Sequence, residues 1–121
     1  MKRILIIDDD DQFRQMLHAM IEKEGYEVKD APDGDVGMSL QEEKPFDLII
    51  TDIIMPNKEG IAVITDLKGL YPDSKIIAIS GGGRIVPNDY LGIAEKLGAD
   101  RTLSKPFERK KLIDTIKELI F

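Results

Sequence analysis

Short apolar runs and longer amphipathic stretches alternate along the whole chain. Residues 4–7, 46–50 and 76–79 are apolar almost throughout, which is typical of strands covered on both faces. Residues 26–31 alternate between apolar and polar side chains and predict a weaker strand at a sheet edge, and residues 101–104 predict a fifth strand. After each run, apolar residues recur at helical spacing. The predicted helices carry them within 13–21, 35–43, 61–70, 88–97 and 112–120.

A strand followed by a helix, repeated five times, is the pattern of a parallel sheet with helices on both faces. Right-handed crossovers in a chain of this length favour the flavodoxin-like strand order 2-1-3-4-5. We therefore predict an α/β fold, a doubly wound (βα)5 parallel five-stranded sheet, in which residues 1–121 form one domain.

The ends of several predicted elements carry residues with a known preference for such positions. Asp10 or Asp11 suits the cap of the first helix, because a carboxylate accepts hydrogen bonds from free N–H groups. Asp33 and Gly34 predict a turn, and Gly98 predicts a left-handed residue at the end of the fourth helix. Four methionines are interpreted as core residues: Met16, Met20, Met38 and Met55.

Composition and charge exclude several classes of function. The chain has 121 residues and no cysteine, so disulfides and thiolate metal sites are excluded. A formal net charge of −6 argues against direct nucleic-acid binding. No run approaches the ~20 apolar residues that cross a membrane, and the first residues lead straight into a strand without a signal peptide. The expected location is the cytoplasm.

Polar side chains follow four of the predicted strands. They are Asp8 and Asp9, Asp52, Ser80 and Lys105, after strands one, three, four and five. The carboxyl ends of parallel strands share one edge, where open α/β sheets place their ligands. Three carboxylates gathered there repel one another, and a divalent cation removes that conflict. Oxygen ligands without histidine or cysteine suit Mg²⁺.

These residues predict phosphoryl transfer to Asp52. The carboxylate would act as the nucleophile, while Mg²⁺ and the Lys105 ammonium stabilise charge on the transferred group. The Ser80 hydroxyl would donate to a phosphoryl oxygen afterwards. Each residue taken alone also has a plainer interpretation: an acid as a helix cap, a serine before glycines as a turn residue, a lysine as a solvated strand end.

Four motifs together resemble the receiver domain of two-component response regulators, in the right order and over essentially the whole chain. They are Ile-Ile-Asp8-Asp9, Thr-Asp52-Ile-Ile-Met-Pro56, Ile-Ser80-Gly and Ser-Lys105-Pro106-Phe107. The resemblance implies that Asp52 accepts phosphate from a histidine kinase, a phosphotransfer protein or a small phosphodonor. It also implies a Mg²⁺ site made by Asp8, Asp9, Asp52 and the backbone carbonyl of Ile54.

The resemblance further implies that Ser80 is the switch hydroxyl and that Lys105 contacts the phosphate. The Lys105–Pro106 bond becomes a candidate for the cis form. Phosphorylation would then change the conformation of the face formed by helix four, strand five and helix five, to which a downstream protein or an output domain binds. The same face is a candidate for dimerisation. The domain would be a signalling switch whose only chemistry is its own phosphorylation and dephosphorylation.

Three features depart from the usual receiver pattern. Thr102 stands three residues before Lys105, where an aromatic switch residue is common, and this puts an aromatic toggle in doubt. The glycines at 81–83 predict a mobile loop, and Ile54 is expected to affect the lifetime of the phosphate. Two alternatives stay open: a Mg²⁺-dependent phosphohydrolase, although Ile54 stands where a second acid is needed, and a constitutive binding module that has lost the switch.

Overall fold

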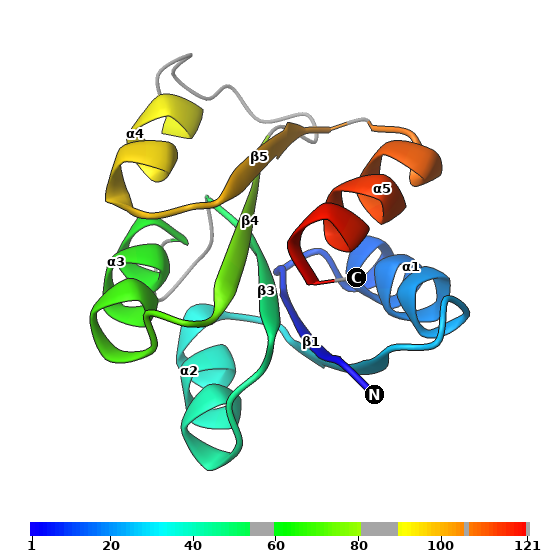
Figure 1. Ribbon diagram of the computed structural model, residues 1–121, viewed down its shortest axis with the longest axis horizontal. Helices are drawn as coiled ribbons and strands as arrows, with labels where there is room; N and C mark the ends of the chain where they lie inside the picture. The colour runs from blue at the N-terminus through cyan, green and yellow to red at the C-terminus, as the bar shows by residue number, and fades with distance from the viewer. Residues whose placement is uncertain (54–59, 81–89, 106, 121) are drawn as a thin grey trace.

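Strands and helices alternate in the computed structural model, which describes residues 1–53, 60–80, 90–105 and 107–120. In chain order the elements are β1 (Arg3–Ile7), α1 (Asp11–Glu22), β2 (Glu27–Ala31), α2 (Gly34–Glu43), β3 (Leu48–Asp52), α3 (Gly60–Leu70), β4 (Lys75–Ser80), α4 (Tyr90–Leu97), β5 (Arg101–Ser104) and α5 (Arg109–Ile120). The strands pair in parallel in the order β2-β1-β3-β4-β5, so the predicted flavodoxin-like fold is confirmed (Figure 1). The weak strand β2 lies at an edge, as its alternating pattern predicts.

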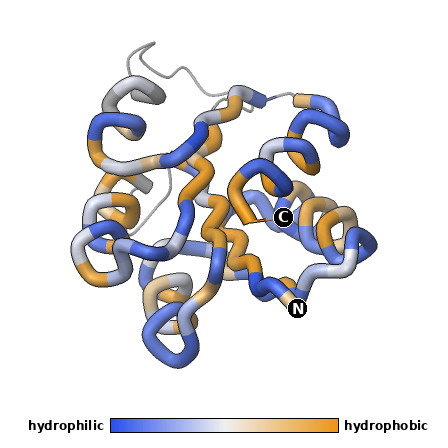
Figure 2. The backbone as a smooth tube through the Cα atoms, viewed as in Figure 1, coloured by the Kyte–Doolittle hydropathy of each residue, from blue (hydrophilic) through white to orange (hydrophobic). Residues whose placement is uncertain are grey.

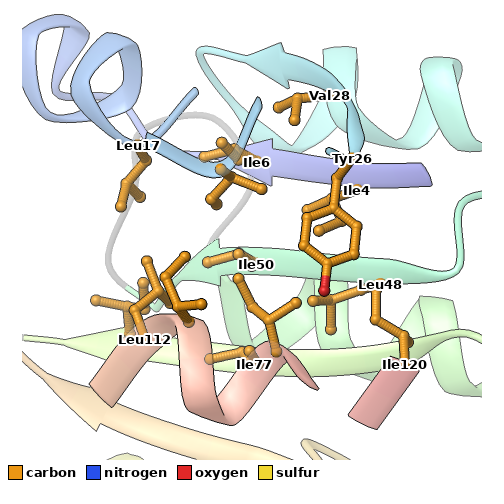
Figure 3. Packing of buried hydrophobic residues seen from close by; sticks show 14 of the residues in the cluster. Ile4, Ile6, Leu17, Tyr26, Val28, Leu48, Ile50, Ile77, Leu112 and Ile120 are labelled. Carbon is orange, nitrogen blue, oxygen red and sulfur yellow. The ribbon is translucent and has the colours of Figure 1, made fainter. Parts of the chain in front are cut away.

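Helices cover both faces of the sheet, with α1 and α5 on one face and α2, α3 and α4 on the other (Figure 1). Side chains alternate along each strand, so Ile4 and Ile6 of β1 join one core cluster while Leu5 and Ile7 join the other. Figure 2 shows the resulting hydrophobic strands between more polar helices. Figure 3 shows the α1–α5 cluster, in which Leu17 and Leu112 from the two helices face the strand side chains.

Two helix ends are capped as the sequence predicts. Of the two candidate caps for α1, Asp10 is the one used: its carboxylate accepts a 3.1 Å hydrogen bond from the backbone N–H of Phe13. Gly98, directly after α4, has a φ of 127°, a conformation that L side chains rarely adopt. None of the helices in the described part of the chain combines the length and hydrophobicity needed to cross a bilayer.

The predictions for α2 and for the methionines need correction. Asp33 is not part of a turn, since its carboxylate caps α2 by accepting from the N–H of Val36, and the helix begins at Gly34. Met16 is 48% exposed, so its interpretation as a core residue is wrong. The buried face of α1 instead follows residues 14, 17 and 21. Met20 and Met38 are partly buried against the two clusters, while Met55 lies outside the described residues.

The edge pair β1–β2 carries an ion pair that makes stability depend on pH. Arg3 Nε donates to Glu27 Oε2 at 2.6 Å, and this hydrogen bond lowers the pKa of Glu27 from its ordinary 4.5. A carboxylate whose pKa is lower in the folded than in the unfolded state stabilises the fold at pH values above its unfolded-state pKa. That stabilisation is lost as the pH falls through the folded-state pKa. Glu27→Gln should therefore lower the urea midpoint at neutral pH and leave it unchanged well below pH 4.5. Equal midpoints at neutral pH would contradict this expectation.

Candidate functional site

The strand register brings the predicted acids to one edge of the sheet. Ile7, the last residue of β1, pairs with Thr51 of β3, so Asp8 and Asp52 follow side by side. Asp52 in turn pairs with Ile79 of β4, next to the end of that strand. The sequence predicts the same arrangement, because the carboxyl ends of neighbouring parallel strands share one edge of the sheet.

Three carboxylates gather at this edge, as predicted. One carboxylate oxygen from each of Asp8, Asp9 and Asp52 lies within 4.8 Å of the others. Asp8 is 1% exposed and Asp52 is 5% exposed, so water solvates these two only slightly. A set of carboxylate oxygens this close together suits a hard divalent cation such as Mg²⁺. The residues present therefore fit the metal that the sequence predicts.

The ammonium of Lys105 lies among these acids. Its Nζ is 3.1 Å from Asp8 Oδ2 and 3.4 Å from Asp52 Oδ2, and the side chain is only 10% exposed. The backbone N–H of Lys105 donates to the carbonyl of Ser80 at 2.7 Å, which fixes the start of the side chain beside β4. Three carboxylates against one ammonium leave two negative charges in excess. That excess attracts a divalent cation.

Asp8 is held through both of its carboxylate oxygens. The backbone N–H of Asp10 donates to Asp8 Oδ1 at 2.9 Å, while Oδ2 faces Lys105. Asp10 itself points its carboxylate at the first turn of α1. The acidic run at residues 8–11 is therefore divided between site and cap, with Asp8 and Asp9 in the cluster and Asp10 on the helix.

Ser80 is buried at the last position of β4, one residue beyond the partner of Asp52. Ser80 therefore lies at the same edge of the sheet as Asp52. Ile54, the glycine loop 81–83 and the Lys105–Pro106 bond lie wholly or partly outside the described residues.

Arg14 is a site residue that the sequence analysis did not single out. Its Nη1 donates to the backbone carbonyl of Asp8 at 2.8 Å, and its Nε donates to Asp30 of β2 at 2.9 Å. Burial alone lowers the pKa of Arg14, but hydrogen bonds and charges from Asp11 and Asp30 outweigh it and raise the pKa. His18 contacts the other oxygen of Asp30 through Nδ1 at 2.5 Å.

Phe13 is the second residue that was missed as part of the site. The sequence predicts it only as an apolar helix residue, yet its ring centroid lies 4.0 Å from Lys105 Nζ. Phe107 packs against the same ring with a centroid distance of 5.9 Å and an interplanar angle of 84°. The signal available in the sequence was the place of Phe13 in the first turn of a helix that directly follows the acids.

We expect Arg14→Met to lower the free energy of unfolding by about 2 kcal/mol, measured by urea denaturation without metal. The substitution keeps much of the side-chain volume but leaves the Asp8 carbonyl and the Asp30 carboxylate without this donor. Arg109→Met is the matched control, since Arg109 makes an exposed ion pair with Glu24. Such pairs contribute at most ~1 kcal/mol. Equal losses in the two variants would contradict the expected role of Arg14.

Comparison with known proteins places almost the whole chain in one family. The family model described as "Response regulator receiver domain" matches residues 4–117. The response regulator receiver protein CpdR of Brucella abortus is 33% identical over 120 residues, which cover 99% of this chain and 98% of that protein. The transcriptional regulatory protein CpxR of Escherichia coli is 32% identical, but this chain spans only about half of its length, with 50% covered.

Comparison with solved structures also finds response regulators. The response regulator protein TrrA of Thermotoga maritima, solved in complex with Mg²⁺-BeF, superposes with a TM-score of 0.87 at 29% sequence identity. The match covers 99% of this chain and 100% of TrrA.

Proposed function

This chain belongs to the response regulator receiver domain family, and we propose that Asp52 is the residue on which it carries the phosphoryl group. Switching through a phosphoaspartate is typical of such domains, which are signalling proteins and not conventional enzymes. One observation carries the assignment to Asp52. Its buried carboxylate lies at the end of the central strand β3, within reach of two further acids and the Lys105 ammonium.

The proposed transfer needs one nucleophile and groups that stabilise charge. A carboxylate oxygen of Asp52 attacks the phosphorus, the new O–P bond forms, and the bond from phosphorus to the donor breaks. The leaving group departs with the electron pair and takes up a proton. Lys105, already 3.4 Å from Asp52, neutralises charge on the phosphoryl oxygens, and the Ser80 hydroxyl then donates to one of them.

The acidic cluster fits a Mg²⁺ site of the kind typical of receivers. In the proposal Asp8, Asp9 and Asp52 would hold the ion together with the backbone carbonyl of Ile54. The ion would offset the negative charge of both the acids and the incoming phosphate. The solved relative TrrA, which binds Mg²⁺-BeF, supports this assignment. Asp8 also contacts the Lys105 ammonium, at 3.1 Å through Oδ2.

A receiver domain has a histidine kinase as its upstream partner. We propose that the phosphoryl donor here is a histidine kinase or a phosphotransfer protein in the cytoplasm. We also propose that residues 1–121 form one domain. The output is a downstream protein or an output domain that reads the α4–β5–α5 face, where a dimer would also form. Thr102 supports coupling within this face, because its Oγ1 donates to Glu95 of α4 at 3.2 Å.

Incubation with acetyl phosphate tests the proposal directly. We expect the intact mass to rise by one phosphoryl group with Mg²⁺ present and to stay unchanged with EDTA. Reduction of the adduct with borohydride should place homoserine at position 52, which is the product expected from an aspartyl phosphate. An adduct elsewhere would overturn the assignment of Asp52. No adduct in samples quenched over a full time course would favour the constitutive binding module.

A further inference from the structure

We propose that Phe13 is a positioning residue whose aromatic ring holds the Lys105 ammonium at the acidic cluster. Lys105 Nζ lies 4.0 Å from the centroid of the Phe13 ring, over its face. The face of an aromatic ring carries partial negative charge and attracts a cation. The same ammonium contacts carboxylates of Asp8 and Asp52, so the ring is a third group that restrains it. This role deepens the proposed function of Asp52 and rests on it.

Lys105 is well placed for this attraction to matter. A cation–π contact is weak when water solvates the ammonium and strong when the ammonium is desolvated. The Lys105 side chain is only 10% exposed. A lysine side chain is otherwise flexible, with a compact charge on four rotatable carbons. The ring therefore reduces the number of positions that the charge occupies.

The ring is itself held in place from two directions. The backbone N–H of Phe13 donates to the carboxylate of Asp10, which fixes the first turn of α1. Phe107, two residues after Lys105, packs edge-on against Phe13 at an interplanar angle of 84° and also packs against the α1–α5 core. An edge-to-face arrangement is a preferred geometry for aromatic pairs. The ring is thus held by the cap of α1 and by a residue close in sequence to Lys105.

The consequence for phosphoryl transfer is preorganisation. A charged group accelerates transfer most when it already lies where charge develops in the transition state. Phe13 holds the Lys105 ammonium close to Asp52 before the phosphoryl group arrives. In this scheme Phe13 acts on phosphoryl transfer only through Lys105.

A series of fluorinated phenylalanines at position 13 tests the proposal. Mono-, di- and trifluorination progressively removes the negative charge from the ring face while the shape changes little. We expect the folding equilibrium constant, measured by urea denaturation without metal, to fall in that order, to about one tenth for the trifluorinated ring. The rate of phosphoryl uptake from acetyl phosphate with Mg²⁺ should fall in the same order, by about tenfold at most.

The Lys105→Met background supplies the control. Without the ammonium, the fall of the folding constant with fluorination should disappear, and the series should be flat or rising. A ring that only fills space gives a flat or rising series in the native background, because fluorination makes the ring more hydrophobic, and that result would overturn the proposal. The same downward series in both backgrounds would also overturn it. Failure of the proposed function is distinguishable, since the unsubstituted chain would then take up no phosphoryl group at all.

Discussion

An Asp52→Asn variant is expected to take up no phosphoryl group under conditions in which the unsubstituted chain takes up one. An amide oxygen is a far weaker nucleophile than a carboxylate, and asparagine has nearly the same shape as aspartate. The loss should therefore be complete while the fold persists. Intact mass after incubation with acetyl phosphate and Mg²⁺ measures the uptake, and a urea denaturation curve shows that the variant is folded.

Asp73→Asn is the matched control for this experiment. Asp73 is exposed between α3 and β4, away from the carboxyl ends of the strands, and its substitution removes the same charge. We expect uptake by this variant to equal that of the unsubstituted chain. An Asp52→Asn variant that still acquires a phosphoryl group would remove Asp52 from its proposed role, and the next residue to test would be Asp9, which lies in the same cluster.

Lys105→Met is expected to lower the free energy of unfolding by about 3 kcal/mol when no metal is present. The substitution removes the ammonium from between Asp8 and Asp52, and their buried carboxylates lose its compensating charge. Removing one partner of a buried ion pair is costly because the other charge stays buried without compensation. Urea denaturation in EDTA measures the loss.

Adding Mg²⁺ should restore much of the stability of this variant, because the cation binds the folded state and neutralises the same acids. The gain on adding Mg²⁺ should be larger for Lys105→Met than for the unsubstituted chain. Lys111→Met is the control, since Lys111 is exposed on α5 and such surface changes stay within about 0.5 kcal/mol. A Lys105→Met variant as stable as this control in EDTA would contradict the expected role of the ammonium.

The candidate site could be predicted from the sequence because it depends on backbone topology. Asp52 is the last residue of β3, and Asp8 and Lys105 directly follow β1 and β5. Once the strands are parallel, residues that follow them converge at one edge whatever the details of packing. Their contacts, 3.1 Å and 3.4 Å from Lys105 Nζ to the two acids, agree with that rule. The register was not needed to predict that they meet.

Other parts of the site depend on packing angles that no local pattern encodes. Arg14 and Phe13 are adjacent in sequence, yet one turns its side chain to the Asp8 carbonyl and the other to Lys105. Which side chain reaches which group depends on how α1 sits on the sheet.

A buried polar network away from the site also could not be predicted from the sequence. It joins Gln41, Ser74 and Phe46, and a glutamine in a helix is normally expected at the surface. Here Gln41 Nε2 donates to Ser74 Oγ at 3.0 Å, and Gln41 Oε1 accepts from the Phe46 N–H at 2.8 Å.

By itself, the sequence determined the order of elements, the buried strands and the edge of the sheet at which the acids meet. Strands covered on both faces are apolar at every position, and residues 4–7 and 76–79 show that directly. Only the tertiary structure decided that Met16 faces solvent, that Asp10 and not Asp11 caps α1, and that Phe13 covers the Lys105 ammonium. These outcomes depend on side-chain direction and on the exact seating of helices on the sheet, which short-range sequence patterns do not specify.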